Sequence, residues 1–498
     1  MVKRPHQNMW KQLIRLSGEA DETLQVQLRK ALARLIVEQR ISQEVPLPSS
    51  RELAEMLQVS RSTVTLAFQR LVDDGYLVSL ERKGYFVNPE RVGAKTSTTR
   101  PADAGADGER DWSMRLRHNV SGQRNIQKPG DWYNYPYPFI FGQIDSNLLP
   151  LSDWRDCWRY ALGARSMAEG GYDRLDQDHA DLVQQLCTRV LPQRGIWAKP
   201  DNVLVTLGAQ NALAMLARLL IKPNDAVGVE NPGYPDARNL FGLETEDIRL
   251  LPVDNEGLVV DSALDECAYL YVTPSFQSPT TVSLSTQRRQ ALLAKAEQHD
   301  IIIIEDDYES EAAFGDEPVP SLKSQDTHNR VIYCGSLSKS LAPGLRLGFL
   351  VADTALINEA RALRRLTLRH PPSLIERTVA NFIDRGHYDS QVNRLARAYR
   401  QRWQAMAEAL DSYFPFADRR HTFGGTSFWI EGPPELDADQ VALEAAKQGI
   451  LIEPGAVHFA ESGPPRNYFR LGFSAIASEK IEPGMRALSK LITQHCAR

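Results

Sequence analysis

The sequence predicts a multidomain protein with an N-terminal winged helix-turn-helix and a larger α/β domain, and three observations predict it. Residues 1–88 hold three helix patterns followed by a short β-rich stretch with a turn in its middle. Residues 131–498 alternate helix patterns with short apolar runs, which are typical of buried strands in a parallel sheet. Residues 89–130 are rich in Ala, Gly, Ser, Thr and Asp without periodicity, so we expect a flexible linker there.

The amino-acid composition is that of a soluble protein and excludes several classes. The chain has 498 residues, of which 42% are hydrophobic and 24% charged, as is typical of a soluble protein with two or three domains. The net charge of −5 argues against a generally cationic nucleic-acid binder. Residues 1–90 carry 13 Lys and Arg against 11 Asp and Glu, so any DNA affinity must come from a localised face. The five cysteines form no CxxC pair, and no apolar run reaches about 18 residues, so we expect no metal, no membrane segment and a cytoplasmic location.

The N-terminal domain is expected to contain three helices and a wing. In the first helix, apolar residues recur at helical spacing, at Leu24, Leu28, Leu32, Leu35 and Ile36. Ser49 or Ser50 is a candidate cap for a short second helix, and Ser60 is one for a third helix, which Gly75 would end. The stretch 76–87 is rich in β-forming residues around an Arg-Lys-Gly turn, which predicts a two-stranded wing.

The larger domain is expected to contain a mostly parallel sheet. Five buried strands are predicted from apolar runs, at Val203–Thr206, Ala226–Val229, Tyr269–Val272, Ile301–Ile304 and Val331–Tyr333. From about residue 353 the chain has longer, Arg-rich helix patterns and then strand and helix patterns, which predicts a smaller C-terminal subdomain.

Polar residues that follow these strands are the first candidates for a site, because open α/β sheets bind ligands beyond the carboxyl ends of their strands. Gly208, Ala209 and Gln210 follow one strand and open a helix, where backbone N–H groups can bind a phosphate. Asp306 and Tyr308 follow a second strand. Alone, each residue has an ordinary alternative as a turn, cap or solvated loop residue, and only their joint order favours a site.

The stretch after the strand at 331–333 predicts a lysine-bound cofactor. Lys339 lies close to the hydroxyl residues Ser336 and Ser338, and Arg346 follows seven positions later. Pyridoxal 5'-phosphate (PLP) needs an amine for a Schiff base, and hydroxyls and a guanidinium for its phosphate. A buried carboxylate such as Asp306 can keep the pyridine nitrogen protonated, and a tyrosine hydroxyl can bond the ring oxygen.

In this order of motifs, residues from about 139 to 495 resemble a class I (fold-type I) aminotransferase, and the whole chain resembles the MocR branch of the GntR regulators. The resemblance implies that Lys339 forms the internal aldimine, that Asp306 pairs with the pyridinium nitrogen and that Tyr308 binds the ring hydroxyl. Tyr234 would stack on the ring, and Arg470 would bind the carboxylate of an amino compound. The phosphate would be held by Gly208, Ala209, Gln210, Ser336, Ser338 and Arg346.

Departures from the aminotransferase pattern lie on the substrate side. The usual Pro-Thr-Gly is replaced within residues 278–281, and the usual Gly-Tyr-Gly-Asp motif is replaced at 171–177. These changes favour cofactor binding without efficient turnover, and we assign no catalytic residue. Asp236, two residues after Tyr234, favours an effector with a second amine, and the alternative is an ordinary loop aspartate.

The N-terminal module resembles the GntR winged helix in residues 47–54, 60–64 and 84–87. The start of the third helix then enters the major groove, so its residues are candidates for base or phosphate contacts. The alternative to DNA contact is a helix-capping role for Ser60 and an ordinary solvated helix position for Arg51. The predicted DNA-binding residues are Arg51, Ser60, Arg61, Ser62, Thr63, Thr65 and, at the wing, Lys83 and Gly84.

Together these features predict a PLP-dependent transcription regulator that binds double-stranded operator DNA. It would sense an amino-group-bearing metabolite by external aldimine formation at Lys339, and it would form a homodimer, arranged head to tail by resemblance. Amino acids, ω-amino acids and aminosulfonates are candidate effectors, and the overall pattern is closest to regulators of taurine or ectoine catabolism. The alternatives are an active aminotransferase with a DNA-binding appendage and a DNA-binding protein whose large domain has lost PLP.

Overall fold

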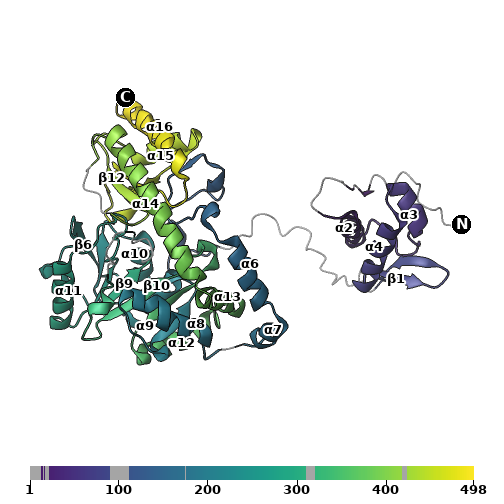
Figure 1. Cartoon of the computed structure of the whole chain (residues 1–498), viewed down its shortest axis with the longest axis horizontal. Helices are drawn as coiled ribbons and strands as arrows, with labels where there is room; N and C mark the ends of the chain where they lie inside the picture. The colour runs from purple at the N-terminus through teal and green to yellow at the C-terminus, as the bar shows by residue number, and fades with distance from the viewer. Residues whose placement is uncertain are drawn as a thin grey trace. The chain divides into compact units, whose positions relative to one another are not determined.

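The computed structural model describes residues 10, 13–14, 16, 22–89, 111–173, 175–309, 314, 320–417 and 423–497. The chain divides into two compact units, Met1–Arg115 and Leu116–Arg498 (Figure 1). The predicted linker ran from 89 to 130, and residues 90–110 of it lie outside the described part. The structure assigns the last fifteen residues of the predicted linker to the larger unit. Among the described residues, no helix is long and apolar enough to cross a membrane.

The smaller unit has the predicted order of three helices and a wing. Its elements are α2 (Leu24–Val37), α3 (Ser50–Leu57), α4 (Arg61–Asp73), β1 (Leu77–Leu80) and β2 (Gly84–Val87). Ser49 caps α3 in a capping box with Glu52, and the Ser60 hydroxyl caps α4 by accepting from the backbone N–H of Thr63 at 3.1 Å. The two strands pair antiparallel. The helices bury one apolar core, which includes Leu28, Leu32, Leu53, Phe68 and Leu71.

An eight-stranded sheet forms the centre of the larger unit. In spatial order its strands are β4 (Val203–Thr206), β11 (Gly348–Val351), β10 (Val331–Ser336), β9 (Ile302–Asp307), β8 (Tyr269–Val272), β5 (Val227–Asn231), β6 (Ile248–Asp254) and β7 (Gly257–Leu258). Only β11 and β7 run antiparallel to their neighbours. The prediction of a mostly parallel α/β sheet is therefore confirmed.

Helices cover both faces of this sheet (Figure 1). Along β4, Val203 and Val205 pack with helices on one face while Leu204 packs with those on the other, as the two-residue period of a strand requires. The first group includes α6 (Leu151–Ala161), α8 (Ala180–Gln185) and α13 (Ser373–Asp384). The second includes α9 (Ala209–Leu220), α10 (Pro235–Phe241) and α12 (Thr354–Thr367). The remaining helices of this region are α7 (Ala164–Gly170) and α11 (Thr286–Gln298).

A C-terminal subdomain carries its own apolar core. It consists of α14 (His387–Tyr413), β12 (Ser427–Glu431), α15 (Ala438–Lys447), β13 (Ile450–Leu451), β14 (Glu453–Pro454), β15 (Tyr468–Gly472) and α16 (Ser478–Cys496). Its core starts within α14, at Leu395, and not near residue 353 as predicted. The reason is that α12 and α13 pack on the main sheet, a choice of partner that helix periodicity does not reveal. Phe139 joins this core, and β3 (Tyr137–Pro138) pairs with β13.

Residues 116–130 contact the larger unit, although their polar composition predicted a linker. Arg124 donates to the backbone oxygen of Phe459 at 2.7 Å, and Asn239 on α10 donates to the backbone oxygen of Arg124 at 3.0 Å. Lys128 pairs with the buried Glu453 at 3.1 Å. Long cationic side chains and backbone groups make these contacts, so the segment docks without the apolar pattern that would have predicted packing.

Candidate functional site

A cavity of about 250 Å³ lies where β9, β10 and the N-terminus of α9 meet. Nine of the ten residues predicted to bind the cofactor line it: Ala209, Gln210, Tyr234, Asp306, Tyr308, Ser336, Ser338, Lys339 and Arg346. The tenth, Gly208, precedes Ala209 on the same turn. The structure thus brings together residues that lie more than 130 positions apart, at the carboxyl ends of strands where ligands of such sheets bind.

Asp306, on β9, presents an unsatisfied carboxylate oxygen in this region. Its Oδ2 accepts a hydrogen bond from the Tyr271 hydroxyl at 2.8 Å, while its buried Oδ1 has no hydrogen-bond partner among the described residues. Burial raises the pKa of Asp306 to about 7, and the hydrogen bond from Tyr271 opposes that shift. A buried acceptor without a donor is costly, and the N–H of a protonated pyridine ring is a donor of the kind this oxygen lacks. Asp306 therefore fits the predicted cofactor.

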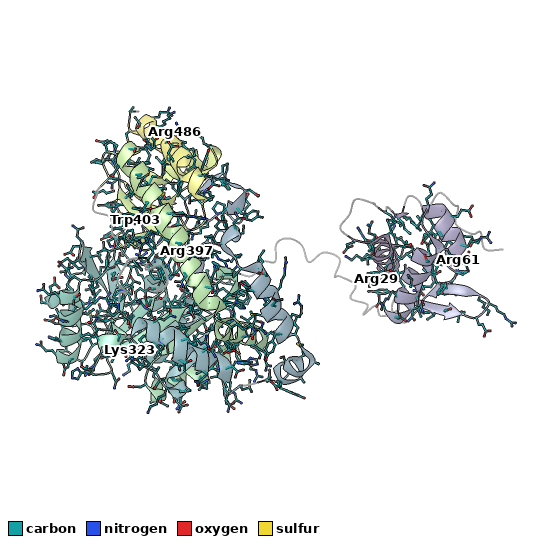
Figure 2. The ribbon with its side chains drawn as sticks, viewed as in Figure 1. Arg29, Arg61, Lys323, Arg397, Trp403 and Arg486 are labelled. Carbon is teal, nitrogen blue, oxygen red and sulfur yellow. The ribbon has the colours of Figure 1, made fainter. Side chains whose placement is uncertain are left out.

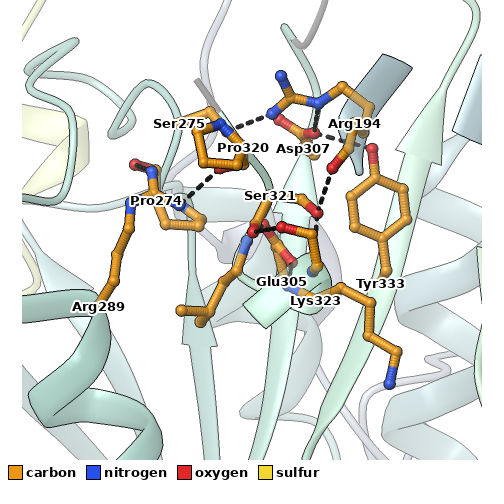
Figure 3. Close-up of polar contacts among 12 residues, drawn as sticks. Arg194, Pro274, Ser275, Arg289, Glu305, Asp307, Pro320, Ser321, Lys323 and Tyr333 are labelled. Carbon is orange, nitrogen blue, oxygen red and sulfur yellow. Dashed lines mark hydrogen bonds and ion pairs between the residues drawn. The ribbon is translucent and has the colours of Figure 1, made fainter. Parts of the chain in front are cut away.

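The carboxylates on either side of Asp306 bind protein groups (Figure 3). Asp307 Oδ2 accepts from Arg194 Nε and from the Tyr333 hydroxyl, both at 2.8 Å. Glu305 accepts from the backbone N–H groups of residues 322 and 323 at 2.7 and 2.8 Å. Because neighbouring side chains on a strand point to opposite faces, these two hold β9 in place from the face opposite the cavity.

Lys339, the predicted Schiff-base lysine, places its amine in the cavity. Burial, together with the positive charge of Lys128, lowers the pKa of its ammonium to about 8. Its Nζ lies 4.4 Å from the centroid of the Phe141 ring. Gly142 has a φ of +75° and lies so close that a Cβ there would collide with Nζ. A lysine whose pKa is lowered in this way holds more free amine at neutral pH, which is the form that attacks a carbonyl.

Small residues and donors converge at the predicted phosphate end. Gly208 has a φ of +78°, and a Cβ there would lie 2.8 Å from Arg346 Nη2, so glycine allows the guanidinium to approach the turn before α9. Ser336 Oγ accepts from the backbone N–H of Ser338 at 3.2 Å, which leaves its own O–H to donate. Ser338 Oγ donates to the backbone oxygen of Leu347 at 3.3 Å. A guanidinium, a hydroxyl and the N-terminus of α9 together suit a phosphate.

Two tyrosines complete the cavity wall. The Tyr308 hydroxyl donates to the backbone oxygen of Phe276 at 2.9 Å. The Tyr234 hydroxyl donates to Asp236 Oδ2 at 3.1 Å and lies 3.3 Å from Gln210 Oε1. Asp236 does not line the cavity, so it is positioned to act through the hydroxyl of Tyr234.

Arg470, the predicted clamp for an acid group, is engaged by a carboxylate of the protein. Its Nε and Nη2 each lie 2.8 Å from Glu453 Oε2, its guanidinium lies 4.1 Å from the Phe141 ring centroid, and it is only 1% exposed. It does not line the cavity, whereas Lys128 does. Burial opposes ionisation of Glu453, but Arg470 and Lys128 lower the pKa of its carboxyl below the usual value.

Several residues of this region were missed from the sequence, among them Lys128, Phe141, Gly142 and Glu453. The segment around Lys128 is polar and aperiodic, and Glu453 lies in a two-residue strand, β14. The pairing of Glu453 with Arg470 across β14 and β15 brings the two together, and no local pattern signals such a pairing.

In the smaller unit, most of the predicted DNA-binding residues lie at the start of α4 and at the wing, and Arg51 lies on α3. Arg51, Arg61, Ser62, Thr65, Lys83 and Gly84 are exposed (Figure 2 labels Arg61), and Thr63 is half-buried. Ser60 is exposed while its hydroxyl caps α4, so the capping alternative is confirmed for this residue. The Thr65 hydroxyl donates to the backbone oxygen of Arg61 at 2.9 Å. Cationic and hydroxyl side chains at a helix start are suited to a major groove.

Fold and site thus define a class of protein, a winged helix-turn-helix regulator that carries an aminotransferase-type domain. Residues 24–87 match the model of the bacterial regulatory proteins of the gntR family, and residues 161–488 match that of aminotransferase class I and II. The chain is 39% identical to the HTH-type transcriptional regulator TauR of Rhodobacter capsulatus, over 94% of this chain and 96% of that protein. It is 30% identical to the probable rhizopine catabolism regulatory protein MocR of Rhizobium meliloti, over 95% and 94%. The protein belongs to the MocR subfamily of the GntR-family transcription regulators.

Solved structures similar to the larger unit are aminotransferases. The α-aminoadipate aminotransferase LysN of Thermus thermophilus, complexed with N-(5'-phosphopyridoxyl)-L-leucine, aligns with a TM-score of 0.70 and 27% identity, over 78% of this chain and all of that one. The kynurenine aminotransferase of Pyrococcus horikoshii aligns with a TM-score of 0.65 and 25% identity, over 80% and 98%. The fold-type I prediction is therefore confirmed.

Proposed function

We propose that this regulator binds PLP at Lys339 and responds to a metabolite that carries a primary amine. The observation that carries the proposal is the cavity itself, in which the unsatisfied Oδ1 of Asp306, the amine of Lys339 and the phosphate-type donors around Arg346 converge. The relatives that support it are LysN, solved with a phosphopyridoxyl compound, and the kynurenine aminotransferase, solved in complex with PMP.

Each of the ten residues predicted to bind the cofactor has a role in this proposal. PLP supplies an electrophilic carbon to which either the lysine or a ligand amine can be joined. Lys339 holds the cofactor covalently, and Asp306 keeps a proton on the ring nitrogen by accepting it in a hydrogen bond. Tyr308 bonds the ring oxygen and Tyr234 stacks on the ring. The phosphate is held by Gly208, Ala209, Gln210, Ser336, Ser338 and Arg346.

The proposed effector is a small amine with an acid group. Lys128 and Arg470 place positive charge at the Phe141 side of the cavity, and such charge favours an anionic group. Arg470 is the sequence-based candidate for the contact, and it would have to share its guanidinium with Glu453. Amino acids, ω-amino acids and aminosulfonates have the required chemistry, and the similarity to TauR makes aminosulfonates the first to test.

The output of the proposed switch is a change in operator binding. Two chains form a homodimer, arranged head to tail, and its two winged helices contact two half-sites on double-stranded DNA in the cytoplasm. The effector acts by favouring one of two arrangements of these heads, which requires different affinities of the effector for the two arrangements. Arg61 and its neighbours at the start of α4 make the base contacts.

The test combines a spectrum with a DNA-binding measurement. The PLP-loaded protein is titrated with amino acids, ω-amino acids and aminosulfonates, while absorbance reports the cofactor and fluorescence anisotropy reports affinity for DNA selected from a random pool. We expect one class to change both signals in the wild type and neither in Lys339→Ala. Absence of bound PLP would contradict the proposal. Sustained turnover of an amine with a 2-oxoacid would favour the alternative, an active aminotransferase.

A further inference from the structure

One cation lines the cavity outside the cofactor-binding set. Lys128 contributes to the cavity wall beside Phe141, Gly142 and Gln143, and its side chain is 23% exposed. Arg470, by contrast, is 1% exposed and stands off the cavity. A ligand that enters the cavity therefore meets the ammonium of Lys128 before it can reach the guanidinium of Arg470.

The bonds of Lys128 leave it able to bind a ligand. Its Nζ donates to the backbone oxygen of Phe141 and lies 3.1 Å from Glu453 Oε1. A lysine ammonium has three N–H donors, so these two oxygens, its partners among the described residues, leave one donor for another acceptor. The contact with Phe141 fixes the ammonium at the cavity wall, which reduces the entropy that a ligand contact would otherwise cost.

The charges around Glu453 favour an anion at this place. The carboxylate of Glu453 accepts from Arg470 and Lys128, and it also accepts from the backbone N–H of Phe141 at 3.3 Å. Lys128 and Arg470 therefore share the carboxylate of Glu453. Burial lowers the pKa of Lys128, while Glu453 and, more weakly, Asp236 act to raise it. A Cβ at Gly142 would lie within 4 Å of both Lys339 Nζ and Lys128 Nζ, so the two amines lie close enough for one small ligand to reach both.

We propose that Lys128 binds the acid group of the effector directly, while Arg470 stays paired with Glu453 and holds that carboxylate in place. The inference rests on the proposed function, because the ligand is the amine that reacts at Lys339. The ligand is a short compound with its amine at one end and a carboxylate or sulfonate at the other.

The position of Lys128 in the chain gives this contact a second consequence. Lys128 lies in the docked segment 116–130, which is also joined to the rest of the larger unit by hydrogen bonds and ion pairs such as those of Arg124 with Phe459 and of Arg117 with Glu244 at 3.7 Å. A ligand bond to Lys128 therefore ties effector occupancy to how firmly this segment is docked. In the chain, this segment begins directly after Arg115, where the smaller unit ends.

The test uses three variants and three probes. Absorbance titrations of the PLP-loaded protein measure the Kd of taurine, of β-alanine and of propylamine, which has the amine but no acid group. We expect Lys128→Met to raise the Kd of taurine or of β-alanine by at least about tenfold, as the loss of one charge-assisted hydrogen bond would. The Kd of propylamine should stay within about twofold of the wild-type value. Lys128→Arg should stay within about threefold of the wild type, because it keeps the charge. Lys222→Met, at an exposed turn, is the matched control.

Hydrogen exchange of residues 116–130 is the second readout. Taurine or β-alanine should slow exchange there in the wild type and in Lys222→Met, and should not do so in Lys128→Met. The inference would be overturned, and the proposed function would stand, if Lys128→Met bound both acids with wild-type affinity and if the acids slowed hydrogen exchange of residues 116–130 in it as in the wild type. If these three amines and the amino acids of the wider screen all left the wild-type spectrum unchanged, the proposed function would fail and the inference with it. The spectrum of each variant without ligand shows whether its cavity has formed.

Discussion

The cofactor cavity and the DNA-reading helix differ in how they obtain their chemistry. The cavity collects residues from segments far apart in the chain and changes them by burial, which brings the pKa of Asp306 to about 7 and that of Lys339 to about 8. The start of α4 presents consecutive residues, among them Arg61 and Ser62, whose side chains are exposed. The cavity depends on the whole fold, whereas the reading helix depends on its cap and on one exposed face.

This difference predicts how mutations should behave in the two regions. A buried group that acts with several others is expected to fail completely or to change several properties at once, because its neighbours were arranged around it. Substitution of an exposed residue that contacts DNA is expected to remove only the binding free energy of that contact and to leave other properties nearly unchanged. Four substitutions test the comparison, in order of decreasing effect.

Lys339→Ala should abolish covalent attachment of PLP. The lysine is the amine that the cavity encloses, and the collision expected at Gly142 shows that the cavity was shaped around its ammonium. The measurement is borohydride reduction followed by mass spectrometry of the intact chain. Circular dichroism serves as the control, since the side chain contributes little to the core. A PLP adduct retained after reduction in the variant would place the covalent link elsewhere.

Asp306→Asn should weaken PLP binding by about tenfold or more, because an amide is a poorer acceptor for a pyridinium N–H than a carboxylate is. The same substitution should stabilise the cofactor-free protein at alkaline pH, since it removes a buried charge whose Oδ1 lacks a partner. Opposite signs for the two effects would show that Asp306 serves the cofactor and not the fold. Equal PLP affinity of the wild type and Asp306→Asn would show that Asp306 does not bind the ring nitrogen.

The pH dependence of Asp306 has a definite sign. Its pKa is about 7 in the folded chain and about 3.9 when unfolded, so the folded state binds the proton more tightly. Its contribution to stability is fully present below pH 3.9 and is lost as the pH rises through 7. The free energy of unfolding of the cofactor-free wild type should therefore fall relative to Asp306→Asn by about 2 kcal/mol between pH 5 and pH 8. Urea unfolding at both pH values measures it, and a constant difference would contradict the shift.

Arg61→Ala should weaken specific DNA binding by about 1 to 3 kcal/mol and leave PLP uptake unchanged. Arg61 is exposed at the first position of α4, so its loss removes a contact without disturbing the cap made by Ser60. Anisotropy at a fixed salt concentration gives the affinity. Arg34→Ala is the matched control, because Arg34 lies on α2 and pairs there with Glu38. An equal loss for both arginines would show a general charge effect and not base readout.

The same contrast explains what could be predicted from the sequence. The buried strands and the cap at Ser60 follow from local patterns. Asp306 and Lys339 were found because each lies close to the carboxyl end of such an apolar run, Asp306 within β9 and Lys339 three residues beyond β10. Lys128 and Glu453 were not found, because each acquires its role from a partner more than 10 residues away in sequence. The start of the C-terminal core in α14 was missed for a similar reason, since helix periodicity shows an apolar face but not what covers it.

Asp236→Asn should have the smallest effect, about 1 kcal/mol on the preference between diamino and monoamino ligands of equal length. Asp236 accepts a hydrogen bond from the hydroxyl of Tyr234 and does not line the cavity. Its charge therefore acts on a ligand from the far side of the Tyr234 ring. The carboxylate should attract a second ammonium, and asparagine keeps an acceptor for the tyrosine while removing the charge. Competition titrations of paired ligands on the PLP-loaded protein measure the preference. If the wild type bound diamino and monoamino ligands equally, Asp236 would serve only to hold Tyr234, and a monoamine with one acid group would be the better effector.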